Sequence, residues 1–183
     1  MQNFRMINPF IQLCAPPEHA AMMQKIIAAE SGGNSLAIHD NKTGKSYFPD
    51  NLSEALAIAS KLMADKNASI DLGLAQINSK NLPRFNASLA DAFDPCSSIK
   101  MGSTIYAEGL KNAISAGLSG DAAIRAALSQ YNTGKLNSTI GAAYASRVLG
   151  GRAIVTINIQ NIQNAPILVD LKGNTGILVS FNP

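Results

Sequence analysis

The apolar positions between residues 16 and 33 recur at helical spacing. In PPEHAAMMQKIIAAESGG, the residues Met23, Ile26, Ile27 and Glu30 fall at i, i+3, i+4 and i+7, so they share one helix face. Two prolines stand at the start of the run and two glycines follow Glu30, and these are ordinary helix start and stop signals. The pattern predicts an amphipathic helix that carries a carboxylate at its end, on its apolar side.

Further start and stop signals predict more helices up to residue 150. Asn51, with Glu54 three residues later, forms a plausible capping pair before the apolar run of residues 52–63. Asp94, followed by a proline, predicts the N-cap of a long helix, and Asp121 is predicted to cap the next one in the same way. The last helix is expected to end at Gly150.

Two parts of the chain have strand-like patterns instead. LAIHDNKTGKSYF, residues 36–48, places turn residues between short apolar runs and predicts a small hairpin. From Ala153 onward, short β-branched runs are separated by a proline and by the turn KGNTG. We therefore expect a mainly α domain with a small β-hairpin region at residues 12–152, followed by a short β-rich tail at residues 153–183.

Composition and charge exclude several classes of protein. The 183 residues are 46% hydrophobic and 15% charged, which is enough apolar material for a folded core. The net charge of +3 is spread thinly, without the basic cluster expected of a nucleic-acid-binding protein, although a mildly basic surface suits an acidic polymer. No apolar run approaches the length of a membrane helix, and the first twenty or so residues, broken by Pro9, match a secretory signal only weakly.

The cysteines and histidines do not form a metal-binding pattern. Cys14 and Cys96 lie far apart without CxxC spacing, and His19 and His39 are the only histidines, so neither a metal nor a cofactor is expected. The two thiols are either buried and inert or joined in one disulfide. In the chain-entropy model a disulfide closing so long a loop adds about 4–5 kcal/mol of stability.

Glu30 is the candidate for acid chemistry. It is either an ordinary helix-end glutamate or an acid held at the floor of a cleft. A carboxylate in the last turn of a helix faces the negative end of the helix dipole, and an apolar surrounding removes its solvation. Both effects raise the pKa of the carboxyl toward that of a useful general acid.

Three motifs follow one another in an order that resembles a known family. ESGGN begins at Glu30, GLAQIN occupies residues 73–78, and YNTG occupies residues 131–134, followed by a helix that bears Tyr and Arg. This set resembles the soluble lytic transglycosylases, whose fold is similar to that of goose-type lysozyme. The cysteines stand in the tripeptides CAP, with Cys14, and DPC, with Cys96. This placement resembles that in the subgroup associated with type IV secretion and conjugation systems.

The resemblance implies cleavage of the β-1,4 bond between N-acetylmuramic acid and N-acetylglucosamine in peptidoglycan. Glu30 matches the family's single catalytic acid, which would protonate the glycosidic oxygen and then accept the proton of the muramic acid 6-hydroxyl. That hydroxyl would attack the anomeric carbon and leave a 1,6-anhydro product. The implied substrate-binding residues are Ser31, Gln76, Asn78, Tyr131 and Asn132. Alternative roles are a helix-end residue for Ser31 and Asn132 and a turn-holding residue for Asn78.

The chain departs from the family pattern at Ala75, where the family usually has methionine, and it has no tryptophan to stack on sugars. Asp71, in SIDLG, is interpreted as a turn or capping residue. Two rival functions stay open: a hydrolytic muramidase on the same fold and a non-catalytic wall-binding scaffold subunit. The implied partners are peptidoglycan strands and components of a secretion or conjugation channel, and the implied compartment is the periplasm, where a Cys14–Cys96 disulfide is permitted.

Overall fold

The computed structural model describes residues 8–150 of the chain, and the predicted β-rich tail at residues 153–183 lies outside them. The helices are α1 Pro9–Cys14, α2 Pro17–Glu30, α3 Leu52–Met63, α4 Leu89–Phe93, α5 Pro95–Ser115, α6 Gly120–Thr133 and α7 Thr139–Gly150, with short 3-10 turns at η1 Ser79–Asn81 and η2 Pro83–Phe85. The strands are β1 Ile38–Asp40, β2 Lys45–Tyr47, β3 Ile70–Leu72 and β4 Ile77–Asn78. The mainly α fold class is therefore confirmed.

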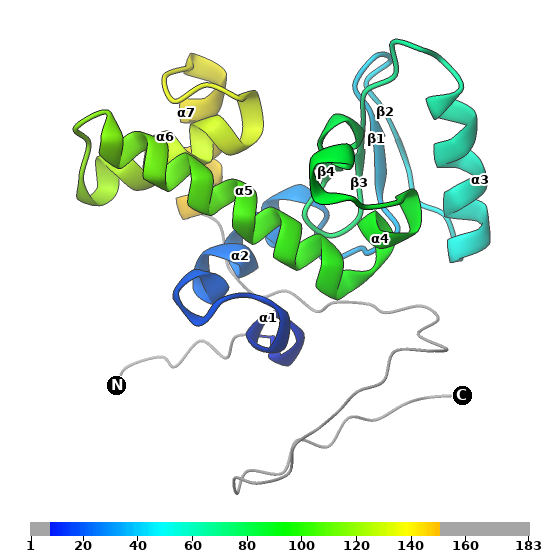
Figure 1. Ribbon diagram of the computed structural model, residues 1–183, viewed down its shortest axis with the longest axis horizontal. Helices are drawn as coiled ribbons and strands as arrows, with labels where there is room; N and C mark the ends of the chain where they lie inside the picture. The colour runs from blue at the N-terminus through cyan, green and yellow to red at the C-terminus, as the bar shows by residue number, and fades with distance from the viewer. Residues whose placement is uncertain (1–7, 151–183) are drawn as a thin grey trace, which may run out of the picture.

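The helices and the sheet form two sides of the molecule, with α5 running between them (Figure 1). α6 and α7 lie at one end of α5, whereas the sheet, α3 and α4 lie toward the other end. α6 packs along both α5 and α7, and α2 contacts both α5 and α7. The end of α2 is therefore held within the helical side of the molecule.

The apolar face of α2 lies in the main core, as its periodicity predicts. Met23, Ile26 and Ile27 are fully buried. Burial of one such side chain stabilises the fold by about 1.5–3 kcal/mol relative to leaving it in water. These three residues anchor the helix whose last residue is Glu30.

The sheet contains the predicted hairpin and two further short strands. It is antiparallel in the order β2-β1-β3-β4, with Ile38 paired to Tyr47 on one side and to Leu72 on the other. Ile70 and Leu72 are fully buried, so the residue between them points to the opposite face of the sheet. That residue, Asp71, is in the middle of β3, and its interpretation as a turn or capping residue is wrong.

Two of the three predicted N-caps are present. The Asn51 side chain accepts a hydrogen bond from the backbone N–H of Glu54, and the Asp94 side chain accepts one from the N–H of Ser97. The prediction for Asp121 is wrong, because α6 begins one residue earlier and Asp121 lies inside its first turn. There the carboxylate accepts a hydrogen bond from Arg125, one turn later, at 2.6 Å. A carboxylate in the first turn still complements the helix dipole.

A disulfide joins Cys14 at the end of α1 to Cys96 in the first turn of α5, with the two Cα atoms 5.1 Å apart. It resolves the two alternatives left open by the cysteine spacing. α1 also packs on α2 and α5, so the bond holds the first helix of the described residues against the longest one. None of the helices between residues 8 and 150 is both long and apolar enough to cross a membrane.

We expect the disulfide to be a large part of the stability of this domain. The bond closes a loop between residues 82 apart in sequence, for which the chain-entropy model gives about 4–5 kcal/mol. When the protein is produced under oxidising conditions and denatured without reductant, a thiol reagent should find no free cysteine. A Cys14→Ser/Cys96→Ser variant should unfold at a clearly lower urea concentration. Two reactive thiols in the denatured wild-type protein would contradict the prediction.

Candidate active site

Glu30 is the last residue of α2, and the segment after it turns sharply away. Ser31 still donates its backbone N–H to the carbonyl of Ile27. Gly32 and Gly33 then adopt φ values of +62° and +92°, which a residue with a side chain rarely adopts. The helix therefore ends at this point, and Glu30 is its last residue rather than part of a continuing turn.

The hydroxyl of Tyr144, in α7, donates a hydrogen bond to the Glu30 carboxylate with a distance of 2.6 Å to Oε1. The guanidinium of Arg147 lies over the Tyr144 ring, 5.3 Å from its centroid. The ring of Tyr131, in α6, is nearly parallel to that of Tyr144, with centroids 6.5 Å apart. Glu30 is thus contacted from an element more than a hundred residues later in the chain.

These surroundings raise the pKa of Glu30 from 4.5 to about 7. The largest cause is loss of solvation on burial, which disfavours the charged form. The negative charge of Asp71 raises the pKa further, whereas the Tyr144 hydrogen bond and the positive charge of Arg147 lower it. Burial outweighs the two favourable partners, so close to neutral pH Glu30 exists in both protonation states.

Asp71 faces Glu30 from the sheet and is held by two amides. Its Oδ2 accepts a hydrogen bond from Asn41 at 2.8 Å, and its Oδ1 accepts one from Asn78 at 2.7 Å. Burial raises the pKa of Asp71, while the two amides and the nearby His39 lower it. Both carboxylate oxygens therefore have a fixed donor, which holds the orientation of this side chain.

A cleft of about 370 Å³ separates Glu30 from the sheet. Most of its lining side chains are polar and uncharged, which suits a ligand rich in hydroxyl and amide groups. The residues that line it are Glu30, Asn41, Ser69, Asp71, Gln76, Asn78, Asn81, Ile105, Tyr131 and Asn132. Within residues 8–150 there is no cluster of three acidic, cysteine or histidine side chains able to hold a metal ion.

Five of the six residues proposed from the sequence for catalysis or substrate binding line this cleft: Glu30, Gln76, Asn78, Tyr131 and Asn132. Ser31 is the exception. Its hydroxyl donates to the carbonyl of Leu74 at 2.8 Å and accepts from the N–H of Gly33 at 3.2 Å. Ser31 therefore joins the end of α2 to the GLAQIN segment rather than facing the cleft.

The side chains of Gln76 and Tyr131 are fixed by backbone carbonyls of the GLAQIN segment and of Ala37. Gln76 has φ +47°, a left-handed conformation that costs about 1–3 kcal/mol in a residue with a side chain. Its side-chain amide donates to the carbonyls of Ala37 and Gly73, which leaves the side-chain oxygen as its free polar group. Tyr131 donates its hydroxyl to the carbonyl of Ala75 at 2.7 Å, so it supports the cleft floor and does not bind Glu30.

Asn78 has the turn-holding role considered for it, and it also lines the cleft. Its side-chain oxygen accepts from the N–H of Lys80 and caps η1, while its amide donates to Asp71 and to the Ser69 hydroxyl. Asn132 lies near the end of α6 and also lines the cleft.

Tyr144 and Asp71 belong to the site, although the sequence did not identify either as a site residue. A signal existed for each. Asp71 is the polar residue between Ile70 and Leu72, so alternation places its charge on the opposite face of a strand from the two apolar side chains. Tyr144 and Arg147 are three residues apart and share one face of α7. Neither signal says which other element that face meets, and so neither identifies Glu30 as the partner.

The Transglycosylase SLT domain matches residues 13–147, which span every residue of the cleft. The chain belongs to this family.

Relatives of this SLT domain include proteins of type IV secretion systems. The chain is 39% identical over 131 residues to the type IV secretion system protein virB1 of Brucella abortus. The aligned region covers 69% of this chain and 54% of that protein. It is 29% identical over 149 residues to protein virB1 of Agrobacterium fabrum, covering 80% of this chain and 59% of that protein. The chain thus spans little more than half the length of these curated relatives. No solved structure matches the chain significantly.

Burial of Glu30 should make the domain less stable at alkaline pH. The folded pKa of about 7 lies above the unfolded value of 4.5, so the wild type loses stability as pH rises from about 4.5 to 7. The full loss is about 3 kcal/mol above that range. Glu30→Gln keeps an acceptor for Tyr144 but does not ionise. In urea unfolding, the variant should have a larger free energy of unfolding than the wild type at pH 8. At pH 5 the difference between the two proteins should be much smaller. An equal difference at both pH values would contradict the pKa.

Proposed function

We propose that the chain is a peptidoglycan lytic transglycosylase that opens the cell wall locally for a type IV secretion or conjugation apparatus. The observation that carries the proposal is Glu30, an acid with a pKa of about 7 at the floor of a cleft lined by amides. Membership of the SLT domain family and the type IV secretion relatives support it. In this proposal the chain would act on the β-1,4 bond between N-acetylmuramic acid and N-acetylglucosamine.

The first step needs a proton donor. At neutral pH a large fraction of Glu30 carboxyls are protonated, because the pKa is about 7. The carboxyl would donate its proton to the glycosidic oxygen as the bond to the anomeric carbon breaks. Tyr144 would hold the carboxyl in one orientation and would stabilise the carboxylate that remains, through the hydrogen bond at 2.6 Å.

The second step needs a base and a nucleophile. The Glu30 carboxylate would accept the proton of the muramic acid 6-hydroxyl, and the hydroxyl oxygen would attack the anomeric carbon. The product is a 1,6-anhydro ring, and Glu30 regains its proton for the next cycle. One carboxyl is sufficient for both steps, since the substrate supplies its own nucleophile and no water is consumed.

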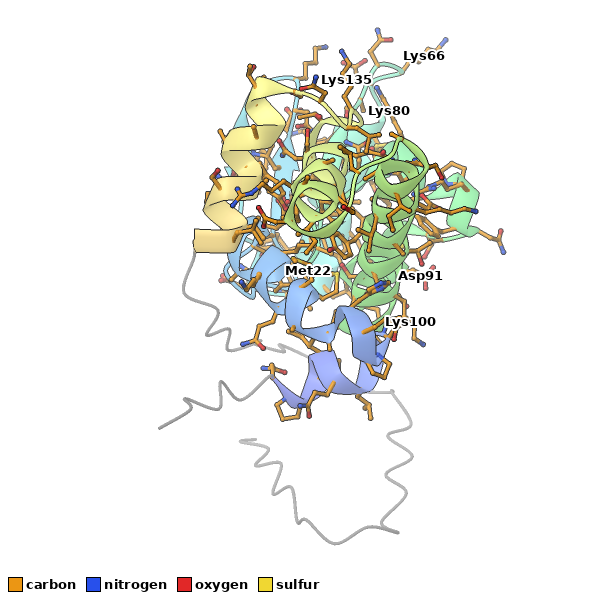
Figure 2. All side chains as sticks on the ribbon, turned by 90° about the vertical axis from the view of Figure 1, so that its left-hand side faces the viewer. Met22, Lys66, Lys80, Asp91, Lys100 and Lys135 are labelled. Carbon is orange, nitrogen blue, oxygen red and sulfur yellow. A yellow bond between two sulfur atoms is a disulfide. The ribbon has the colours of Figure 1, made fainter. Side chains whose placement is uncertain are left out.

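Substrate binding would use the polar walls of the cleft. The free side-chain oxygen of Gln76 is an acceptor for an acetamido N–H, and Asn81 and Asn132 supply both donors and acceptors. The exposed lysines Lys80 and Lys135 follow cleft residues in the chain and project from the same end of the molecule (Figure 2). They would attract the carboxylates of the peptide stems on the glycan strands.

The compartment follows from the substrate. Peptidoglycan lies outside the inner membrane, in the periplasm of a Gram-negative cell, where disulfides form and persist. The Cys14–Cys96 disulfide suits that environment. The virB1 relative from Brucella abortus is a type IV secretion system protein by name, which supports a secretion or conjugation channel as the partner assembly.

A hydrolytic muramidase is the second candidate function, and one observation favours it. Asp71 lines the same cleft as Glu30, and glycosidases that use water or a covalent intermediate need a second carboxyl about 5–10 Å from the acid. Asn41 and Asn78 occupy both oxygens of Asp71, which favours a fixed negative charge over a mobile base. In the transglycosylase, that charge would stabilise the developing positive charge on the sugar ring.

Mass spectrometry of the muropeptides released from purified peptidoglycan tests the proposal. The wild type should release 1,6-anhydro products, and Glu30→Gln should release them at least a hundred-fold more slowly, because an amide cannot donate the proton. Asp71→Asn should slow release without changing the product. Reducing-end products from the wild type would instead establish the hydrolase, with Asp71 as its second carboxyl.

Glu18→Gln is the matched control for this experiment. Glu18 lies in the first turn of the same helix, is exposed and does not line the cleft, so this variant should cleave as the wild type does. Binding of peptidoglycan without cleavage by the wild type would support a non-catalytic scaffold and contradict the proposal.

A further inference from the structure

α7, which carries Tyr144, lies unusually close to α6 at one position. A Cβ atom added to Gly141 would lie 2.0 Å from Oγ of Ser129, 2.6 Å from its Cβ and 2.7 Å from its Cα. Real Cβ atoms do not approach other heavy atoms within about 3.0 Å. Only glycine therefore allows α7 to lie where it does against α6.

Ser129 has little freedom to move away from such a Cβ. It is buried, and its hydroxyl donates to the carbonyl of Lys135 at 2.8 Å. Its own carbonyl accepts a hydrogen bond from the Thr133 hydroxyl at 2.7 Å. A change of rotamer would not relieve the contact, because the Cα atom of Ser129 also lies within 2.7 Å. The helix that would yield is α7.

Gly141 and Tyr144 are three residues apart on α7 and are both buried, so they lie on neighbouring parts of the same helix face. The Tyr144 hydroxyl reaches Glu30 at 2.6 Å, close to the shortest distance usual for such a bond. A displacement of α7 by several tenths of an ångström would lengthen that bond substantially. The packing at Gly141 and the hydrogen bond at Glu30 are thus linked through one turn of helix.

We infer that Gly141 is a positioning residue for the acid: its lack of a side chain seats α7 against Ser129 and so holds the Tyr144 hydroxyl on Glu30. The inference rests on the proposed function for its catalytic meaning, but the positioning itself does not require activity. It assigns a role to a glycine that contacts neither the substrate cleft nor Glu30.

The direction of the effect follows from the groups that face Glu30. Tyr144 and Arg147 of α7 favour its charged form, Asp71 of β3 disfavours it, and Tyr131 of α6 bonds to a backbone carbonyl instead. Both favourable groups belong to α7. A displacement of α7 by several tenths of an ångström would weaken both contacts but is too small to admit a water molecule. The loss of solvation and the charge of Asp71 would therefore remain, and the pKa of Glu30 would rise above its value of about 7.

Titration of the Glu30 side-chain carboxyl by 13C NMR tests the inference without a substrate. The chain contains only four glutamates, at positions 18, 30, 54 and 108, and Glu30→Gln identifies the resonance. Gly141→Ala should titrate about one pH unit above the wild type, as should Tyr144→Phe, since a hydrogen bond to a charged group is lost. Folded and unfolded molecules in slow exchange give separate resonances, so the midpoint is read from the resonance of the folded state.

Gly150→Ala is the matched control, because it makes the same chemical change on the same helix where an added Cβ meets nothing within 4 Å. It should titrate as the wild type does. In the Tyr144→Phe background, Gly141→Ala should add less than half of its own shift, since the bond it disturbs is already absent.

A wild-type titration for Gly141→Ala, or a full additional shift in the Tyr144→Phe background, would overturn the inference. If Gly141→Ala does not fold, Ser129→Thr crowds the same contact from α6 with a single methyl group and should give a smaller upward shift; a wild-type titration there would overturn it equally. Failure of the proposed function has a different signature. In that case the shifts would be present, but neither the wild type nor any variant would cleave peptidoglycan.

Discussion

The burial of one carboxyl at the end of α2 is the constraint on which the site depends. Ionising Glu30 in this position costs about 3 kcal/mol relative to water, a substantial fraction of the stability of a domain of this size. The fold holds Glu30 there by burying Met23, Ile26 and Ile27 below it and by ending the helix in two glycines. The energetic penalty and the raised pKa are two expressions of the same physical effect.

The other cleft residues come from elements that only the tertiary fold brings together. α7 supplies the hydrogen bond from Tyr144, the sheet supplies the charge of Asp71, and the GLAQIN segment supplies Gln76 in a strained backbone conformation. Ser31 joins the end of α2 to the GLAQIN segment through the carbonyl of Leu74. These contacts restrict the side chains to single orientations, and such restriction keeps a site in one geometry.

Local patterns predicted much of this structure. Helical periodicity and end signals located α2 and placed Glu30 on its last turn, and residue order identified the family. The sequence did not predict that Tyr131 would bond to Ala75 while Tyr144 bonds to Glu30, because both tyrosines lie on buried faces of adjacent helices. That choice depends on the spacing of α6 and α7, set at Gly141. Asp71 was misjudged for a related reason: its partners, Asn41 and Asn78, lie in separate segments.

The dependence of the initial cleavage rate on pH tests the central claim most directly, that burial keeps a large fraction of Glu30 protonated at neutral pH. With purified peptidoglycan as substrate and release of muropeptides as the readout, the rate should fall on the alkaline side with a midpoint near 7, because deprotonated Glu30 cannot donate to the glycosidic oxygen. A rate that continues to rise through pH 9 would contradict the account.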